Sequence, residues 1–108
     1  MRTLYRIVRT NPPALEDFKS HAELGKAPHD DDPYVRRLAQ GVSVFATLAQ
    51  ARRNARIFPS LGAFVAEIAI PDEATCTAER SGRHPGHHTL WASPADLLRW
   101  VVAVHSVT

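Results

Sequence analysis

The amino-acid sequence predicts a single α+β domain: a small mixed or mainly antiparallel sheet with two to four short helices. The chain has 108 residues, of which 44% are apolar and 22% charged, which is ordinary for a globular domain. Helix-like segments gather in its first half and strand-like runs in its second, which favours α+β over a doubly wound sheet. It contains no internal repeat or linker, so we expect residues 1–108 to form one domain.

The first predicted strand covers residues 4–9 and ends before Pro12. Its alternation places Arg6 on the same face as Leu4 and Val8. An arginine between two apolar side chains is unusual on a half-buried strand. We therefore take Arg6 as a candidate functional residue.

Two short helices are expected next. Residues 14–24 carry apolar side chains at roughly helical spacing, and Gly25 can end that helix. Asp32 can cap a second helix that has Pro33 in its first turn and stops at Gly41.

The clearest predicted unit runs from strand to helix to strand. Residues 42–46 form a short apolar strand, and Thr47 with Gln50 matches a capping box at the start of a helix over residues 48–58. The alternating run at residues 64–70 predicts the following strand.

The remaining elements are shorter. We expect a weak strand at residues 74–79, a helical turn opened by Ser93 and Pro94, and a final strand at residues 101–107. The large side chains expected to anchor the core or an interface are Trp91 and Trp100.

Composition weighs against several function classes, although nucleic-acid binding through the arginines of the helix over residues 48–58 is not excluded. The net charge of +2 and the dispersed arginines, with no interleaved aromatics, do not support nucleic-acid binding. No apolar run approaches the roughly 20 residues that span a membrane, and the start resembles no signal peptide, so we expect a cytoplasmic protein. Cys76 is the only cysteine, which we interpret as a small buried hydrophobic residue.

Histidines concentrate in the loop His84-Pro85-Gly86-His87-His88. Together with His105 and Cys76 they match no standard zinc spacing, and no metal is expected. A solvated loop is one interpretation of this cluster. A histidine that contacts a ligand or transfers a proton is the other.

The layout of the chain resembles the small bacterial ADP-ribosyltransferases, particularly the compact rifamycin-inactivating type. The matching pieces, in order, are Leu4-Tyr5-Arg6, Val44-Phe45-Ala46-Thr47, the helix that starts at Leu48, and the strand from Ala63 to Ile68. The resemblance implies an enzyme that binds NAD and transfers ADP-ribose to a protein, a nucleic acid or a small molecule.

The resemblance also implies site residues. Arg6 would contact the nicotinamide ribose or a phosphate of NAD, and an acid on a late strand would stabilise the positive charge that develops on the ribose. Glu79 is the first candidate for that acid and Glu67 the second. The implied set is Tyr5, Arg6, Ser43, Phe45 and Thr47 for NAD binding, with Arg6 and Glu79 as the catalytic residues.

A second hypothesis is a non-catalytic binding or regulatory module of the same fold, for example in a bacterial toxin–antitoxin or defence system. Ile7 stands where the family has glycine, and Phe45 lacks the phenol of the usual stacking tyrosine. The target is not identified by the sequence, and both a partner protein and a second copy of the chain are open.

Overall fold

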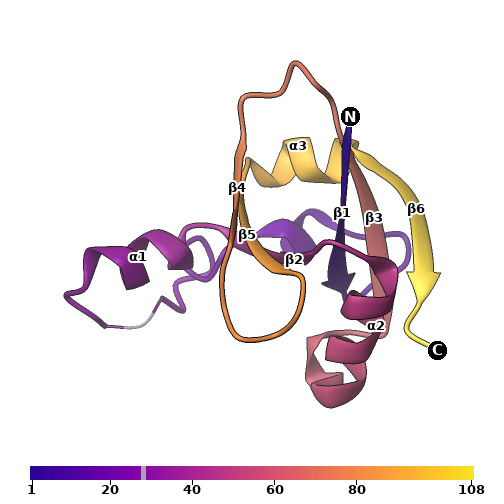
Figure 1. Cartoon of the computed structure of the whole chain (residues 1–108), viewed down its shortest axis with the longest axis horizontal. Coiled ribbons are helices and arrows are strands. Elements are labelled where there is room, and N and C mark those ends of the chain that lie inside the picture. The colour runs from indigo at the N-terminus through magenta and orange to yellow at the C-terminus, as the bar shows by residue number, and fades with distance from the viewer. Residues whose placement is uncertain (28) are drawn as a thin grey trace.

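The computed structural model describes residues 1–27 and 29–108, which fold around one six-stranded antiparallel sheet (Figure 1). The strand order is β4-β5-β2-β1-β3-β6, which confirms the α+β class. The strands are β1 (Arg2–Val8), β2 (Val42–Phe45), β3 (Phe64–Ile70), β4 (Thr77–Arg80), β5 (His87–Trp91) and β6 (Val101–Ser106). The helices are α1 (Pro33–Ala39), α2 (Leu48–Ile57) and α3 (Pro94–Arg99), with 3-10 turns η1 (Leu15–Phe18) and η2 (Pro59–Leu61).

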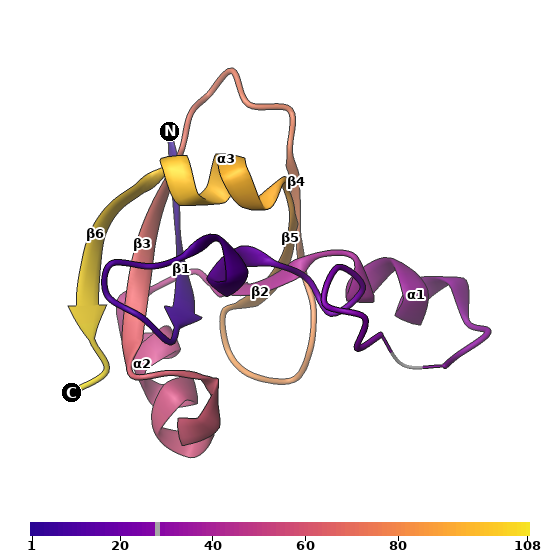
Figure 2. The same cartoon turned by 180° about the vertical axis from the view of Figure 1, so that it is seen from behind.

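The sheet is covered on both faces. One core cluster joins Leu4 and Val8 of β1 to Phe18 of η1 and Leu97 of α3. The other joins Ile7 of β1 to the α2 side chains, and Figures 1 and 2 show η1 and α2 on opposite sides of the sheet. Strand β1 contributes side chains to both clusters, because successive side chains of a strand point to opposite faces of the sheet.

Strand β1 is paired very unequally with its two neighbours. It pairs with β3 from Arg2↔Ile70 to Val8↔Phe64, but with β2 only at Tyr5↔Phe45. Beyond Tyr5, β1 and β2 therefore diverge. This divergence opens the sheet near the end of β1.

The turn after α2 packs tightly against the end of β1. Gly62 has φ 151°, and a Cβ on it would lie 2.2 Å from the carbonyl oxygen of Val8. Only glycine allows this conformation and this approach together. The turn consequently borders the opening between the strands.

The predicted helix over residues 14–24 is wrong. Only Leu15–Phe18 forms a 3-10 turn there, and separate turns follow at residues 21–25. Local side-chain bonds explain this: the Asp17 carboxylate accepts the N–H groups of Arg9 and Ala14, and Ser20 and Glu23 bond each other's backbone N–H groups. Such bonds compete with a continuous helix for the same backbone groups.

Other boundaries differ less. The weak strand predicted at residues 74–79 is found as Thr77–Arg80, and β5 begins at His87, inside the histidine-rich loop that the sequence predicts. Trp100 packs against the core and Trp91 is half-buried, and Cys76 is also half-buried rather than enclosed. Within the described residues, no helix is long and apolar enough to cross a membrane.

Candidate binding cleft

A cleft of about 600 Å³ lies where β1 and β2 diverge. Its walls come from the end of β1, from β2, from the segment after β1 that contains η1, from the end of α2, and from the turn before β5. The segment after β1 contributes the cations Arg9, Lys19 and Lys26, the acids Glu16 and Asp17, and the ring of His21. The opposite wall contributes Phe58, Leu61, His84 and His87.

Arg6 lies in this cleft and holds its two sides together. Its Nε donates to the carbonyl oxygen of Asp17 at 2.7 Å, and its Nη1 donates to the carbonyl oxygen of Ser43 at 2.8 Å. Arg6 thus bonds a β2 carbonyl in the region where the two strands have separated. The side chain substitutes for a missing backbone contact.

The charge of Arg6 is not neutralised by contact. Burial lowers the pKa of its guanidinium to about 10, although the nearby negative charge of Asp17 acts to raise it. The group therefore stays cationic at neutral pH. In the part of the chain that the structure describes, Arg6 forms no ion pair with a carboxylate.

The acids at the cleft already have partners. The carboxylate of Asp17 accepts hydrogen bonds from the N–H groups of Arg9 and Ala14 and from the hydroxyl of Thr10. Burial alone would raise the pKa of Asp17, but these bonds and the charge of Arg6 lower it. Glu16 forms an ion pair with Lys19 at 2.6 Å.

The opposite wall contains an ordered imidazole. His87 Nδ1 lies 2.9 Å from the carbonyl oxygen of Ser81, and its ring meets the Phe45 ring edge to face with centroids 5.3 Å apart. Burial lowers the pKa of His87; the bond to Ser81 opposes this, and the charges of His84 and His88 add to it. His84 packs against Phe58 in a similar edge-on contact at 5.5 Å.

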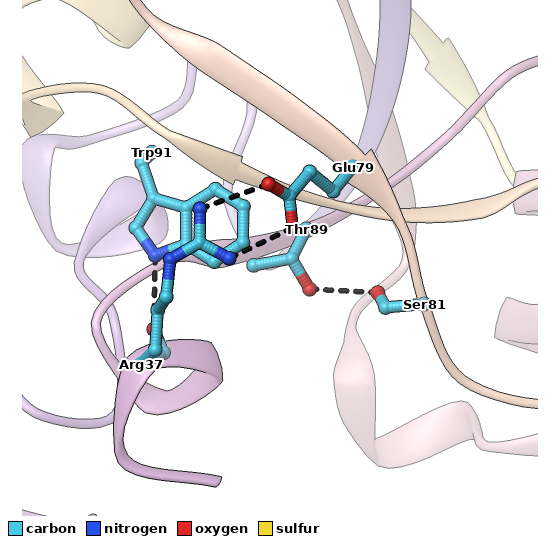
Figure 3. Close-up of polar contacts among 5 residues, drawn as sticks. All are labelled: Arg37, Glu79, Ser81, Thr89 and Trp91. Carbon is cyan, nitrogen blue, oxygen red and sulfur yellow. Dashed lines mark hydrogen bonds and ion pairs between the residues drawn. The ribbon is translucent and has the colours of Figure 1, made fainter. Parts of the chain in front are cut away.

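Glu79 is engaged elsewhere, at the edge of the sheet (Figure 3). Its carboxylate accepts two hydrogen bonds from Arg37 of α1, at 2.7 and 2.9 Å. The Arg37 guanidinium lies 4.0 Å over the Trp91 ring, and Trp91 Nε1 donates to the Arg37 carbonyl oxygen at 2.9 Å. The hydrogen bonds from Arg37 lower the pKa of Glu79, and those same bonds raise the pKa of Arg37.

The structure brings together three of the residues expected at the site. Arg6, Ser43 and Phe45 all line the cleft. Tyr5 packs against the α2 side of the sheet, and Thr47 caps α2 by accepting a hydrogen bond from the Gln50 N–H.

Neither expected acid lies beside Arg6. Strands β5 and β2 separate Glu79 on β4 from Arg6 on β1. Glu67 lies on β3, 3.0 Å from His105 of the neighbouring strand β6. The expected catalytic pair of Arg6 and Glu79 is therefore not brought together in this conformation.

Several cleft residues carried no individual signal in the sequence. Arg9, Lys19 and Lys26 belong to an irregular segment, whose position depends on the bonds that Asp17 makes. His87 belongs to the histidine-rich loop, where contact with a ligand was one of the two interpretations.

No group of three or more His, Cys, Asp or Glu side chains in residues 1–27 and 29–108 is arranged to hold a metal ion. Comparison of the chain with protein-family models, with curated proteins and with solved structures finds no match. The cleft geometry is therefore the main basis for a functional proposal.

Proposed function

We propose that the cleft between β1 and β2 binds a small phosphate-bearing ligand of nucleotide type, and that NAD is this ligand. The observation that carries the proposal is Arg6, a half-buried cation held by two carbonyl oxygens and paired with no carboxylate of the described chain. A cation withdrawn from water is costly unless something compensates it, and a phosphate would do so with charge-assisted hydrogen bonds.

The rest of the cleft supports the same ligand class. The lining holds four cations, which are Arg6, Arg9, Lys19 and Lys26, against the two acids Glu16 and Asp17, and this excess of positive charge favours an anion and accelerates its encounter. A volume of about 600 Å³ falls within the usual range for small-molecule sites. Phe58, which is 44% exposed, offers apolar surface for a base or a nicotinamide ring, whereas Phe45 in the same lining is buried.

NAD itself enters through the resemblance to ADP-ribosyltransferases, in which the counterparts of Arg6, Ser43 and Phe45 contact this cofactor. A cytoplasmic location, which the sequence predicts, would give the cleft access to cellular NAD. Membership of a bacterial toxin–antitoxin or defence system, and a target protein or nucleic acid, stay predictions.

The geometry favours binding of NAD without transfer of ADP-ribose. Transfer needs a carboxylate beside the ribose to stabilise its developing positive charge. Glu79 is bonded to Arg37, Asp17 to three donors, and Glu16 to Lys19. We therefore propose a binding or regulatory module, with nicotinamide release as the reaction that would contradict this choice.

Titration calorimetry with NAD tests the proposal. Arg6→Ala should weaken NAD binding by about 100-fold or more. The substitution removes a charge-assisted contact to the ligand, and it removes the hydrogen bonds that join Asp17 and Ser43 across the cleft. Arg9→Ala, which removes an exposed cation of the cleft, should weaken binding by about tenfold or less without unfolding the protein.

Arg56→Ala is the matched control, since Arg56 is also an exposed arginine but lies on α2 outside the cleft lining. It should change NAD affinity by less than about twofold. Wild-type protein that binds no NAD at millimolar concentration would refute NAD as the ligand. Equal losses in Arg9→Ala and Arg56→Ala would refute the cleft as the site.

A further inference from the structure

The ring of His87 is oriented before any ligand arrives. Its Nδ1 lies 2.9 Å from the carbonyl oxygen of Ser81, and the Phe45 ring meets it edge-on. Gly82 closes around the same part of the ring, because a Cβ on Gly82 would lie 3.1 Å from Nδ1. These contacts fix the ring plane.

The bond to Ser81 also decides which nitrogen carries the proton. Nδ1 lies 2.9 Å from the Ser81 carbonyl oxygen and 3.1 Å from the Ser81 hydroxyl. The carbonyl oxygen can only accept, so the Nδ1–H form satisfies the shorter contact, and the Ser81 hydroxyl can then donate to Thr89 Oγ1 at 2.7 Å. In the neutral ring, Nε2 is then an acceptor with a lone pair. The lowered pKa of His87 keeps the ring in this neutral form at neutral pH.

Nε2 has no hydrogen-bond partner in residues 1–27 and 29–108. In the same residues, no enclosed side-chain nitrogen or oxygen lacks a partner, so Nε2 is open to solvent or to a ligand. His87 lines the cleft and is the cross-strand partner of Phe45, which packs on the α2 side of the sheet. Lys19 and Lys26 follow η1, which packs on the other side.

We propose that His87 Nε2 accepts a hydrogen bond from a hydroxyl or amide N–H on the ring half of the bound ligand, while the cations opposite hold its phosphates. The inference rests on the proposed function and adds a division of the cleft into two parts. The phosphate part supplies affinity for any polyphosphate. His87 selects ligands that also carry a donor on a sugar or a base.

Three probes separate the two parts: NAD, ADP-ribose and inorganic pyrophosphate. His87→Asn retains an amide that can reach Ser81 but removes the acceptor at Nε2. It should weaken NAD binding about tenfold and leave pyrophosphate affinity within about twofold. His87→Gln places an amide oxygen nearer to the position of Nε2 and should recover part of the NAD affinity.

ADP-ribose identifies the donor. A loss for both NAD and ADP-ribose in His87→Asn assigns it to a ribose hydroxyl, and a loss for NAD alone assigns it to the carboxamide. Nitrogen-15 NMR of histidine-labelled wild-type protein gives a measurement that needs no variant. It should show the Nδ1–H form of His87, with the Nε2 signal shifting when NAD is added.

Failure of the role of His87 and failure of the proposed function give different experimental results. Unchanged NAD affinity in His87→Asn, or an Nε2–H form in the NMR spectrum, overturns the role of His87 and leaves the proposed function standing. An equal loss of NAD and pyrophosphate binding overturns it as well, because His87 would then support the cleft rather than select its ligand. Wild-type protein that binds none of the three probes refutes the proposed function, and this inference with it.

Discussion

Arg37 on helix α1 and Arg6 on strand β1 have opposite electrostatic surroundings. Arg37 is exposed, yet it is bonded twice to Glu79 and stacked on Trp91. Arg6 is more buried, yet it bonds only to the carbonyl oxygens of Asp17 and Ser43. The cation with better access to water has a carboxylate partner, and the one with poorer access has none in the described chain.

This contrast separates a structural arginine from a candidate functional one. The contacts of Arg37 link α1 to the edge strand β4 and to its neighbour β5. Arg37 is exposed, so solvent would tolerate its charge without a carboxylate partner. Leaving Arg6 without an ion pair is costly, and the charge of Asp17 nearby offsets only part of the effect of burial on its pKa. We therefore expect removal of each arginine to have different effects.

The largest effect on stability is expected from Arg6→Ala. It leaves the carbonyl oxygens of Asp17 and Ser43 without their donors, and hydrogen bonds to a charged group contribute about 1.5–3 kcal/mol each. Because Arg6 is only half-buried, we expect the free energy of unfolding to fall by about 2 kcal/mol in total, measured by urea denaturation. A loss no greater than that of Arg37→Ala would contradict the contrast between the two sites.

A smaller effect is expected from Asp17→Asn. The amide retains one acceptor oxygen where the carboxylate serves the N–H groups of Arg9 and Ala14 and the Thr10 hydroxyl, so stability should fall by about 1 kcal/mol. The lowered pKa of Asp17 stabilises the fold above its ordinary value of 3.8, and this contribution is lost as pH falls through the folded-state pKa.

Denaturation between pH 2 and 6 checks that prediction. Wild-type stability should decline in acid more steeply than that of Asp17→Asn. Parallel curves would show that Asp17 is not the group responsible. The same comparison tests whether the hydrogen bonds of Asp17 stabilise the segment that carries Arg9 and Lys19 at the cleft.

The sequence predicts well those elements whose determinants are local. The cap of α2 is an example, because Thr47 and Gln50 bond each other's backbone N–H groups as their spacing indicates. Asp32 and Ser93 likewise cap α1 and α3. Each of these bonds joins residues two or three positions apart, so no knowledge of the fold is needed.

The cleft depends on contacts that a sequence does not reveal. The separation of β1 from β2 follows from pairing with strands distant in the chain and from the reach of Arg6 to Ser43. Arg6 could nevertheless be singled out, because a charge on an apolar strand face violates the usual pattern. Glu79 could not be placed, since its partner Arg37 is 42 residues away and belongs to another element.

A pH-dependent effect is expected from His87. Its folded-state pKa is lowered, so the unfolded chain binds more protons below the ordinary value of 6.5, and stability should decrease as pH falls from 6.5 through the folded-state pKa. His87→Gln should remove this part of the pH dependence, and thermal denaturation between pH 5 and 8 measures it. A wild-type curve that matches the variant over this range would contradict the lowered pKa.

The smallest effects on stability and NAD affinity are expected from Arg37→Ala and Glu79→Gln. Both remove an exposed ion pair, and the backbone contact from Trp91 to α1 is retained, so the thermal midpoint should shift by only a few degrees. NAD affinity should change by less than about twofold, because Arg37 and Glu79 lie outside the cleft lining.

Glu79→Gln is the sharper test, since it keeps the Arg37 stacking on Trp91 while removing the carboxylate that the ADP-ribosyltransferase resemblance makes catalytic. If the wild-type protein releases nicotinamide from NAD and Glu79→Gln abolishes that release without weakening NAD binding, Glu79 must leave Arg37 and reach the ribose. Arg37, Glu79 and Trp91 would then belong to the active site, and the distinction between a structural Arg37 and a functional Arg6 would be wrong.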